Sequence, residues 1–308
     1  MTEIIKTSGL IEQHIHGAFG VDFCVATSEE IIELSKKLFK LGITGFFPTL
    51  VTDSVENLKR QIKEIKVAQE LQPNNTAKVI GIHLEGPFIN PDKKGIHDEK
   101  LIQKPSIETF QQIEDEIIKI VTIAPELDFD FELCDYLQSK GIKVSAGHTL
   151  TTDLSKVHQV THLFNAMGTI DHKKSTTATV ALTNDRIYTE VIADSIHIND
   201  EVLKLIFKTK PTEKTILISD ALPIAKSNLK EMVFCNKTIY LNENKATSES
   251  GTIAGSAMLL PDIIKNLVNK NLTTFEQAIQ MTSINLHNYH KIPMTTEIKW
   301  DSELNVIQ

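Results

Sequence analysis

The sequence is poor in the residue types that mark several protein classes. Its three cysteines, Cys24, Cys134 and Cys235, lie far apart and form no Cys-x-x-Cys pair. We therefore expect neither a disulfide framework nor a cysteine metal site, and reduced thiols fit a cytoplasmic location. The chain holds one Trp, four Tyr and no long basic run, and its net charge is −8. This composition argues against a nucleic-acid partner.

Long apolar stretches are missing as well. No run of 18 apolar residues occurs, so we expect no membrane-spanning helix. The first 20 residues lack a basic segment followed by an apolar one, so we expect no signal peptide. What remains is ordinary for a globular protein: 308 residues, 41% hydrophobic and 23% charged. Because α/β barrels of this length commonly form one domain, we expect residues 1–308 to form a single domain.

Apolar runs of strand length alternate with amphipathic segments along most of the chain. Thr27-Ser28-Glu29-Glu30 is typical of a capped helix start, and Gly42 follows the apolar face that ends at Phe39. Such alternation predicts parallel strands joined by crossover helices, and seven or eight units predict an α/β fold of the (β/α)8 TIM-barrel type. The expected strands are 43–49, 78–85, 118–123, 142–146, 159–162, 187–192 and 215–219, and the expected helices are 29–40, 54–71, 107–116, 131–139, 201–207, 261–269 and 274–286.

Two segments depart from this alternation. In residues 232–252, apolar residues such as Val233, Ile239 and Leu241 alternate with polar ones, which predicts a β-hairpin inserted into the barrel. The tail, residues 292–308, holds one or two further strands by the same criterion.

A histidine pair near the start suggests metal chemistry. His14 and His16 are two residues apart, and on a strand such residues point to the same face. Gly17 then lets the chain turn away. The spacing alone is weak evidence, because most histidines are ordinary core or surface residues.

Charged and imidazole side chains also stand where the later strands end. Carboxyl ends of parallel barrel strands converge on one face, so we expect these side chains to meet there. The donors are nitrogen and oxygen with no thiolate, a set that suits Zn²⁺, Fe²⁺, Co²⁺ or Mn²⁺ and leaves a position open for water. Asp220 would take the proton of the attacking water and return it to the leaving group. The residues of this set are Glu85, His148, His162, Asp194, His197 and Asp220.

Five motifs carry a family resemblance from about Gly9 to Asn288. They are GIHLEGPF at 81–88, SAGHT at 145–149, THLFNAM at 161–167, SDA at 219–221 and GTIAGS at 251–256. The chain resembles N-acetylglucosamine-6-phosphate deacetylases, which belong to the metal-dependent amidohydrolase superfamily. The HLEGP and HLFNAM motifs are specific to that family, whereas His-x-His is common to the superfamily. The resemblance implies hydrolysis of the N-acetyl amide of an amino sugar phosphate to acetate and glucosamine 6-phosphate.

The resemblance also implies a metal site. Glu85, His148 and His162 match the main metal ligands of the family. His14 and His16 match the pair that holds a second ion in members that keep both histidines. One or two divalent ions, zinc or iron, are therefore implied for each chain.

The remaining roles implied by the resemblance concern the reaction and the substrate. Asp220 matches the catalytic acid and base. The residues matched to substrate binding are His97, Asn165, Ala166, Asp194, His197 and the loop residues Ile253, Ala254 and Gly255.

The chain departs from the family pattern at three places. Lys173 stands where the family usually has an arginine that binds phosphate, often across a dimer interface; it keeps the charge but lacks the bidentate fork. Ser195 replaces a glycine in the Asp-Gly-x-His pattern. Only eight residues precede Gly9, so we expect the family's small β domain to be largely absent and its face to be covered in a homodimer.

Two alternatives to the favoured function stay open. The altered Lys173 region is compatible with another N-acyl amino sugar, such as an unphosphorylated one. A catalytically inactive barrel that binds sugar phosphate is the second alternative, and the intact Glu85, His148, His162 and Asp220 argue against it.

Overall fold

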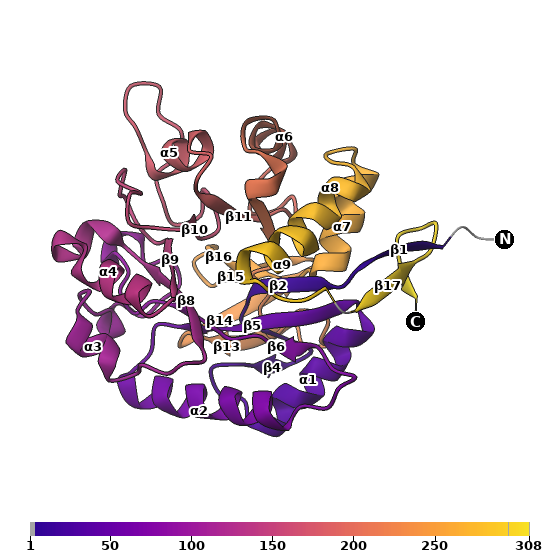
Figure 1. Ribbon diagram of the computed structural model, residues 1–308, viewed down its shortest axis with the longest axis horizontal. Helices are drawn as coiled ribbons and strands as arrows, with labels where there is room; N and C mark the ends of the chain where they lie inside the picture. Colours follow the sequence, from indigo (N-terminus) through magenta and orange to yellow (C-terminus); the bar gives the residue numbers. More distant parts are fainter. Residues whose placement is uncertain (1–3, 295, 308) are drawn as a thin grey trace.

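Eight parallel strands form the centre of the molecule. The computed structural model describes residues 4–294 and 296–307, and its strands follow one another in chain order around a central axis (Figure 1). The ring closes where Asp220 N donates to His14 O at 2.9 Å and His16 N donates to Ala221 O at 2.9 Å. The predicted TIM-type barrel is thus confirmed. Its strands are β2 (Leu10–Ile15), β5 (Ile43–Val51), β7 (Ile82–Glu85), β8 (Ile118–Ile123), β9 (Lys143–Ala146), β10 (Gln159–Val160), β11 (Tyr188–Ile192) and β12 (Thr215–Ile218), and β6 (Lys78–Val79) pairs with β5.

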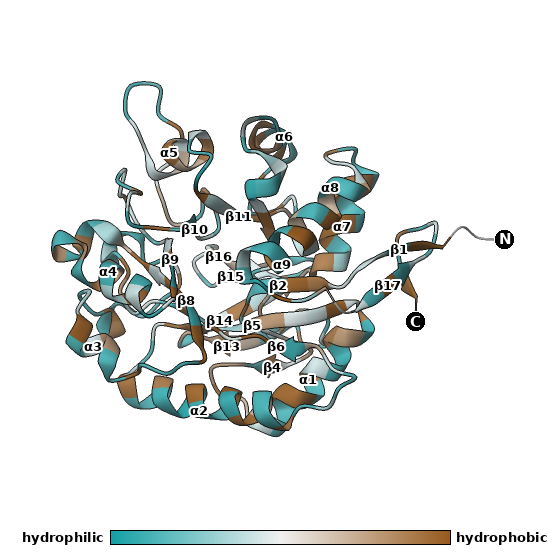
Figure 2. Ribbon diagram, in the orientation of Figure 1, coloured by the Kyte–Doolittle hydropathy of each residue, from teal (hydrophilic) through white to brown (hydrophobic). Residues whose placement is uncertain are grey.

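Amphipathic helices surround this barrel. In α1 the Thr27 hydroxyl accepts from Glu30 N, and the Glu30 carboxylate accepts from Thr27 N at 2.9 Å, which is the predicted capping box. Helix α2 alternates hydrophilic and hydrophobic residues along its length, as a helix with one buried face does (Figure 2). The helices are α1 (Ser28–Lys40), α2 (Val55–Leu71), α3 (Ile107–Gln111), α4 (Glu132–Ser139), α5 (Thr177–Thr183), α6 (Asp200–Thr209), α7 (Leu260–Asn269), α8 (Phe275–Ile279) and α9 (Asn285–His290), with a π-helical turn at Gln280–Ile284 between the last two.

Three helices differ from the sequence prediction, one of which, predicted over 274–286, continues to His290 with the π-helical turn inside it. Helix α3 ends at Gln111 rather than at 116 because Asp115 turns the chain: its carboxylate accepts from Ile117 N at 3.0 Å and pairs with Lys66. Helix α5 was missed because its residues, TATVALT, are mostly β-branched and have low helix propensity. A capping box between Thr176 and Thr179 offsets that disadvantage.

The inserted β structure is larger than the predicted hairpin. Strands β13 (Glu231–Phe234) and β14 (Lys237–Asn242) form that hairpin, and β15 (Lys245–Ser248) and β16 (Ile253–Ser256) extend it to a four-stranded antiparallel sheet. A register shift between Ala246 and Thr247 bends β15 against β16. Strand β16 then returns to the barrel, where Ser256 N donates to Asp220 O at 2.9 Å.

A small antiparallel sheet lies where the two ends of the chain meet (Figure 1). It consists of β1 (Ile5–Ser8), β17 (Glu297–Trp300) and β18 (Val306–Ile307), which accounts for the strands predicted in the tail; residues 295 and 308 of that segment lie outside the described residues. Trp300 is fully buried, packs edge-on against Phe275 and donates to Thr7 Oγ1 at 2.9 Å. None of the helices described here has the length and apolar character needed to cross a membrane.

Candidate active site at the carboxyl ends of the barrel strands

The barrel strands deliver the predicted donors to one place with a regular offset. Glu85 is the last residue of β7, while His148, His162 and Asp220 each stand two residues beyond the end of β9, β10 and β12. His14 lies on β2 itself. Although they are far apart in sequence, all five side chains lie at the same end of the barrel.

The backbone is strained at three of these positions. His148, His162 and Asp220 have positive φ angles of 48°, 30° and 51°, a region that side chains other than glycine rarely adopt. Such residues persist only where the surrounding structure holds them. At His148 the carbonyl accepts from Asn90 N at 2.9 Å, and at Asp220 the amide donates to His14 O. All three of these residues line the pocket described below.

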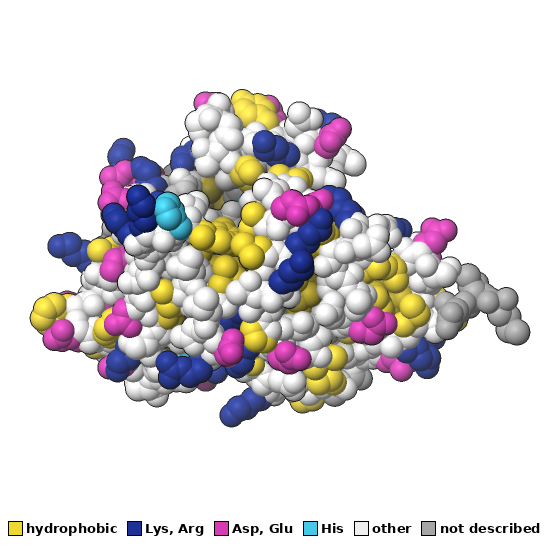
Figure 3. All heavy atoms as spheres, turned by 90° about the horizontal axis from the view of Figure 1, so that it is seen from above, with side chains coloured by type: hydrophobic (Ala, Val, Ile, Leu, Met, Phe, Trp, Pro, Cys, Tyr) yellow, Lys and Arg dark blue, Asp and Glu magenta, His cyan; other side chains and the backbone are white. Residues whose placement is uncertain are grey.

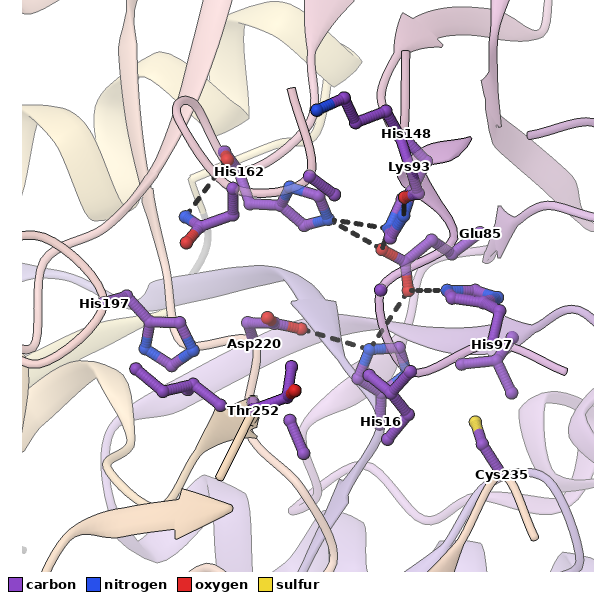
Figure 4. Close-up of a pocket in the computed structure, with 18 of the residues that line it drawn as sticks. His16, Glu85, Lys93, His97, His148, His162, His197, Asp220, Cys235 and Thr252 are labelled. Carbon is purple, nitrogen blue, oxygen red and sulfur yellow. Dashed lines mark hydrogen bonds and ion pairs between the residues drawn. The ribbon is translucent and has the colours of Figure 1, made fainter. Parts of the chain in front are cut away.

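Glu85 is the centre of the site. Its Oε1 lies 2.8 Å from His162 Nε2 and 3.0 Å from His148 Nε2 (Figure 4). Its Oε2 lies 3.3 Å from His16 Nε2 and 3.6 Å from His14 Nε2. One carboxylate therefore joins two ligand clusters, Glu85–His148–His162 and His14–His16–Glu85, each with its donor atoms within 4.8 Å of one another.

The charges of this site call for a cation. Burial lowers the pKa of His16, but the carboxylates of Asp220 and Glu85 outweigh it and raise that pKa to about 9. Burial likewise raises the pKa of Asp220, while His14 and His16 hold it below its ordinary value. The Nε2 atom of His14 is buried, faces these two carboxylates, and has no hydrogen-bond partner within the described ranges. Nitrogen and oxygen donors gathered around two carboxylates fit a divalent metal ion.

A pocket of about 440 Å³ opens above the two clusters. His97 lies on its wall: Nδ1 contacts Thr52 Oγ1 at 2.8 Å, and Nε2 lies 3.6 Å from Glu85 Oε2. Burial lowers the pKa of His97 to about 4, so its ring is neutral at pH 7. On another wall (Figure 4), His197 Nδ1 lies 2.8 Å from Asp194 Oδ2. Burial lowers the pKa of His197, but Asp194 outweighs this and raises it above its ordinary value.

The loop after β10 and the strand β16 complete the pocket. Asn165 donates through Nδ2 to the carbonyls of His162 and Leu163, which fixes the side chain beside the metal ligands. Ala166 adopts a φ of 49° in the same turn. Ile253, Ala254 and Gly255 line the pocket from β16, and the hydrogen bonds of Ser256 to the barrel hold them there.

Lys173 is the one predicted site residue that lies neither on the pocket wall nor in contact with a residue of that wall within its own chain. It is exposed, and its backbone N donates to Asp171 Oδ1 at 2.8 Å in the loop between β10 and α5. Among the described residues, Lys93 is the one lysine or arginine on the pocket wall. Lys93 lies close in sequence to Gly95 and to the predicted site residue His97, which could have indicated that it belongs to the site. A single lysine near one site residue does not, however, define a role.

Comparisons with known proteins identify relatives of one family. No family model matches the chain. A curated N-acetylglucosamine-6-phosphate deacetylase from Bacillus subtilis is 33% identical over 292 residues, which cover 90% of this chain and 73% of the relative. The protein of the same name from Haemophilus influenzae is 30% identical over 290 residues, covering 90% and 75%. A solved N-acetylglucosamine-6-phosphate deacetylase from Thermotoga maritima superposes with a TM-score of 0.88 at 26% identity, over 98% of this chain and 86% of the other.

The fold and the site together indicate a broad class of protein. A parallel barrel that gathers imidazoles around a shared carboxylate at its strand ends is characteristic of metal-dependent hydrolases of the amidohydrolase type. The curated relatives narrow this class. The chain belongs to the N-acetylglucosamine-6-phosphate deacetylase family.

Proposed function

We propose that this chain hydrolyses the N-acetyl amide of N-acetylglucosamine 6-phosphate and releases acetate and glucosamine 6-phosphate. Membership of the deacetylase family supports the substrate and the reaction. The observation that carries the chemistry is the bridging position of Glu85 between two histidine clusters, with Asp220 Oδ1 only 3.1 Å from His16 Nε2.

Glu85, His148 and His162 would hold the essential ion, and His14 and His16 would hold a second one that shares Glu85. When bound, a divalent ion such as zinc or iron supplies Lewis acidity, which lowers the pKa of water from 15.7 to about 7 and polarises the amide carbonyl. His97 lies beside Glu85 as a neutral imidazole, which can donate a hydrogen bond to an oxygen of the substrate.

Asp220 would move the proton. Its side chain reaches the pocket from the loop after β12, and it is ionised because His14 and His16 hold its pKa below the ordinary value. A carboxylate in this place can take a proton from the attacking water and return it to the amide nitrogen as the C–N bond breaks. The main-chain bonds from Asp220 N to His14 O and from Ser256 N to Asp220 O fix its position against both sheets.

Two cationic groups would bind the phosphate. The raised pKa of His197 favours an imidazolium on one side of the pocket, and Lys93, another residue of the pocket wall, provides an ammonium group (Figure 4). Asn165, Ala166 and the loop 253–255 would hold the sugar between them. Phosphate attracts such groups through charge-assisted hydrogen bonds.

One observation favours a second candidate substrate. The pocket wall carries a single lysine within the described part of the chain, and Lys173 is exposed outside it. An unphosphorylated N-acyl amino sugar therefore remains the alternative. A cytoplasmic location and a homodimer also stay predictions.

Steady-state kinetics of the metal-loaded enzyme test the proposal. We expect acetate release from N-acetylglucosamine 6-phosphate with a kcat/KM well above that for free N-acetylglucosamine and N-acetylgalactosamine. A reversed preference would favour the second candidate. No acetate from any of the three, from an enzyme with a full metal complement, would contradict both and favour the inactive barrel.

A further inference from the structure

His14 differs from the other histidines of the site in what lies behind its ring. Its Nδ1 is 3.2 Å from the carboxylate oxygen Glu190 Oε2. In contrast, His16 Nδ1 faces the carbonyl of Thr49 at 3.2 Å, and His148 Nδ1 faces the carbonyl of Lys93 at 2.7 Å. His14 is therefore the one metal-facing histidine of the described chain that is backed by an acid.

Glu190 is fully buried on β11 and is held from several sides. Its Oε1 accepts from Gln13 Nε2 at 2.5 Å and from Gln159 Nε2 at 3.0 Å, while Oε2 faces His14 and the more distant His162 N at 3.4 Å. Only a carboxylate offers two acceptor oxygens to these converging N–H groups. An amide would replace one of the oxygens with an NH2 donor that faces other donors. The charge and direction of the Glu190 side chain are thus determined by its surroundings.

A metal ion at Glu190 itself is a competing explanation, because His14, His83 and Glu190 lie close enough to hold one. However, both nitrogens of His83 already have partners: Nδ1 contacts Gln13 O at 3.2 Å, and Nε2 contacts Thr122 Oγ1 at 2.8 Å. The three residues are therefore a hydrogen-bonded layer below the metal clusters rather than a third site.

We propose that Glu190 is a positioning residue that prepares His14 for the second metal ion. By accepting the Nδ1 proton of His14, it leaves the Nε2 lone pair directed at the space between Glu85 and Asp220, where Nε2 has no partner in the described structure. Carboxylates behind ligating histidines fix the tautomer and raise the basicity of the ligand. The inference rests on the proposed metal site. It adds that Glu190, a residue of β11, controls how tightly the cluster His14–His16–Glu85 binds its metal ion.

Metal titration of the apoenzyme tests this without any activity measurement. Zinc is added to wild type, Glu190→Gln and Glu190→Ala in competition with a chromophoric chelator, and bound equivalents are counted by mass spectrometry. For each variant we expect one of two equivalents to bind roughly 10–100-fold more weakly while the other is unchanged. The matched control is Thr189→Val, a buried neighbour on the same strand whose hydroxyl has no partner; it should bind both equivalents as wild type does.

A double variant separates positioning from a general loss of structure. If Glu190 acts through His14, then His14→Ala and the variant His14→Ala with Glu190→Ala should bind zinc alike, because the ligand that Glu190 orients is gone. Wild-type affinities in Glu190→Ala, or equal weakening of both equivalents in a variant whose unfolding temperature is unchanged, would overturn the proposal. These results do not depend on the substrate: a chain that released no acetate could still show the selective loss.

Discussion

The two ligand clusters share Glu85 but are built in different ways. His148 and His162 stand on loops beyond β9 and β10, at positive φ, and neither ring is backed by a carboxylate: His148 Nδ1 faces a carbonyl, and His162 Nδ1 has no partner in the described chain. His14 lies within strand β2 and is backed by the buried carboxylate of Glu190. One cluster depends on strained loops and the other on hydrogen bonds inside the barrel.

This difference separates two properties of the site. His148 and His162 line the pocket, so an ion held by them would be the one that a substrate reaches. His14 is fully buried and does not line the pocket, whereas His16 does. We call Glu85–His148–His162 the loop cluster and His14–His16–Glu85 the strand cluster. We expect the loop cluster to determine whether the reaction occurs and the strand cluster to determine how many ions bind.

Removing the ligands of the loop cluster should have the largest effect. In Glu85→Ala both proposed ions would lose a shared ligand, and in His148→Ala the proposed pocket-facing ion would lose one of three. Because the ion lowers the pKa of water by several units, we expect kcat to fall by roughly three orders of magnitude or more. Chelation of wild type should give the same loss, reversed by added zinc. Acetate release at the wild-type rate from metal-free protein would rule out the mechanism.

Asp220→Asn should have the next largest effect, and it tests the chemistry apart from the ions. The amide keeps the size of the side chain but cannot accept the proton, so we expect kcat to fall roughly 10²–10⁴-fold. Glu85, His148 and His162 remain, so the variant should still bind at least one equivalent of metal. Stopped assays of acetate and metal analysis of the same sample measure both. An unchanged kcat would mean that another group moves the proton.

His14→Ala should have a smaller effect than either. The Glu85–His148–His162 cluster stays complete, so we expect the variant to lose one of two metal equivalents and about tenfold in kcat, a change of about 1.4 kcal/mol in the barrier. The number of bound metal equivalents and the kcat are measured for His14→Ala and for His148→Ala, and the two variants are compared. If the two variants lose the same activity, the clusters are equivalent in function and the distinction drawn from their construction is wrong.

The sequence predicted the barrel well because its signals are local. Capping residues such as Thr27 and Glu30 set the helix starts, and apolar runs set the strands. The helix α5 was missed because its Thr and Val residues have a weak propensity that a local capping box offsets. Strand β15 lies within the predicted segment 232–252 and pairs with its neighbour β14. Strand β16 lies beyond that segment and bonds to the barrel through Ser256 N and Asp220 O, a contact that no local pattern reports.

Only the site residues that stand at or just beyond the ends of the barrel strands could be predicted from the sequence. Glu85, His148, His162 and Asp220 were placed together by topology and by the family motifs, and the structure brings them together. Glu190 was not found, although a glutamate in the apolar run 187–192 is unusual. A buried acid signals a need for partners, but its partner His14 is 176 residues away and is visible only in the folded chain.

Lys93 offers the finest test of the comparison, because its backbone supports the loop cluster while its side chain lines the pocket. Its carbonyl accepts from His148 Nδ1, and substitution leaves that bond in place. In Lys93→Ala we therefore expect an unchanged metal content and an unchanged kcat. The KM for N-acetylglucosamine 6-phosphate should rise about tenfold, roughly the 1.4 kcal/mol of one charge-assisted bond. Turnover of free N-acetylglucosamine should not change.

Lys173→Ala is the matched control, since this exposed lysine lies outside the pocket of its own chain. A rise in KM for Lys173→Ala alone would place phosphate binding on a lysine reaching in from a second copy of the chain, and Lys93 would then serve His148 only through its carbonyl.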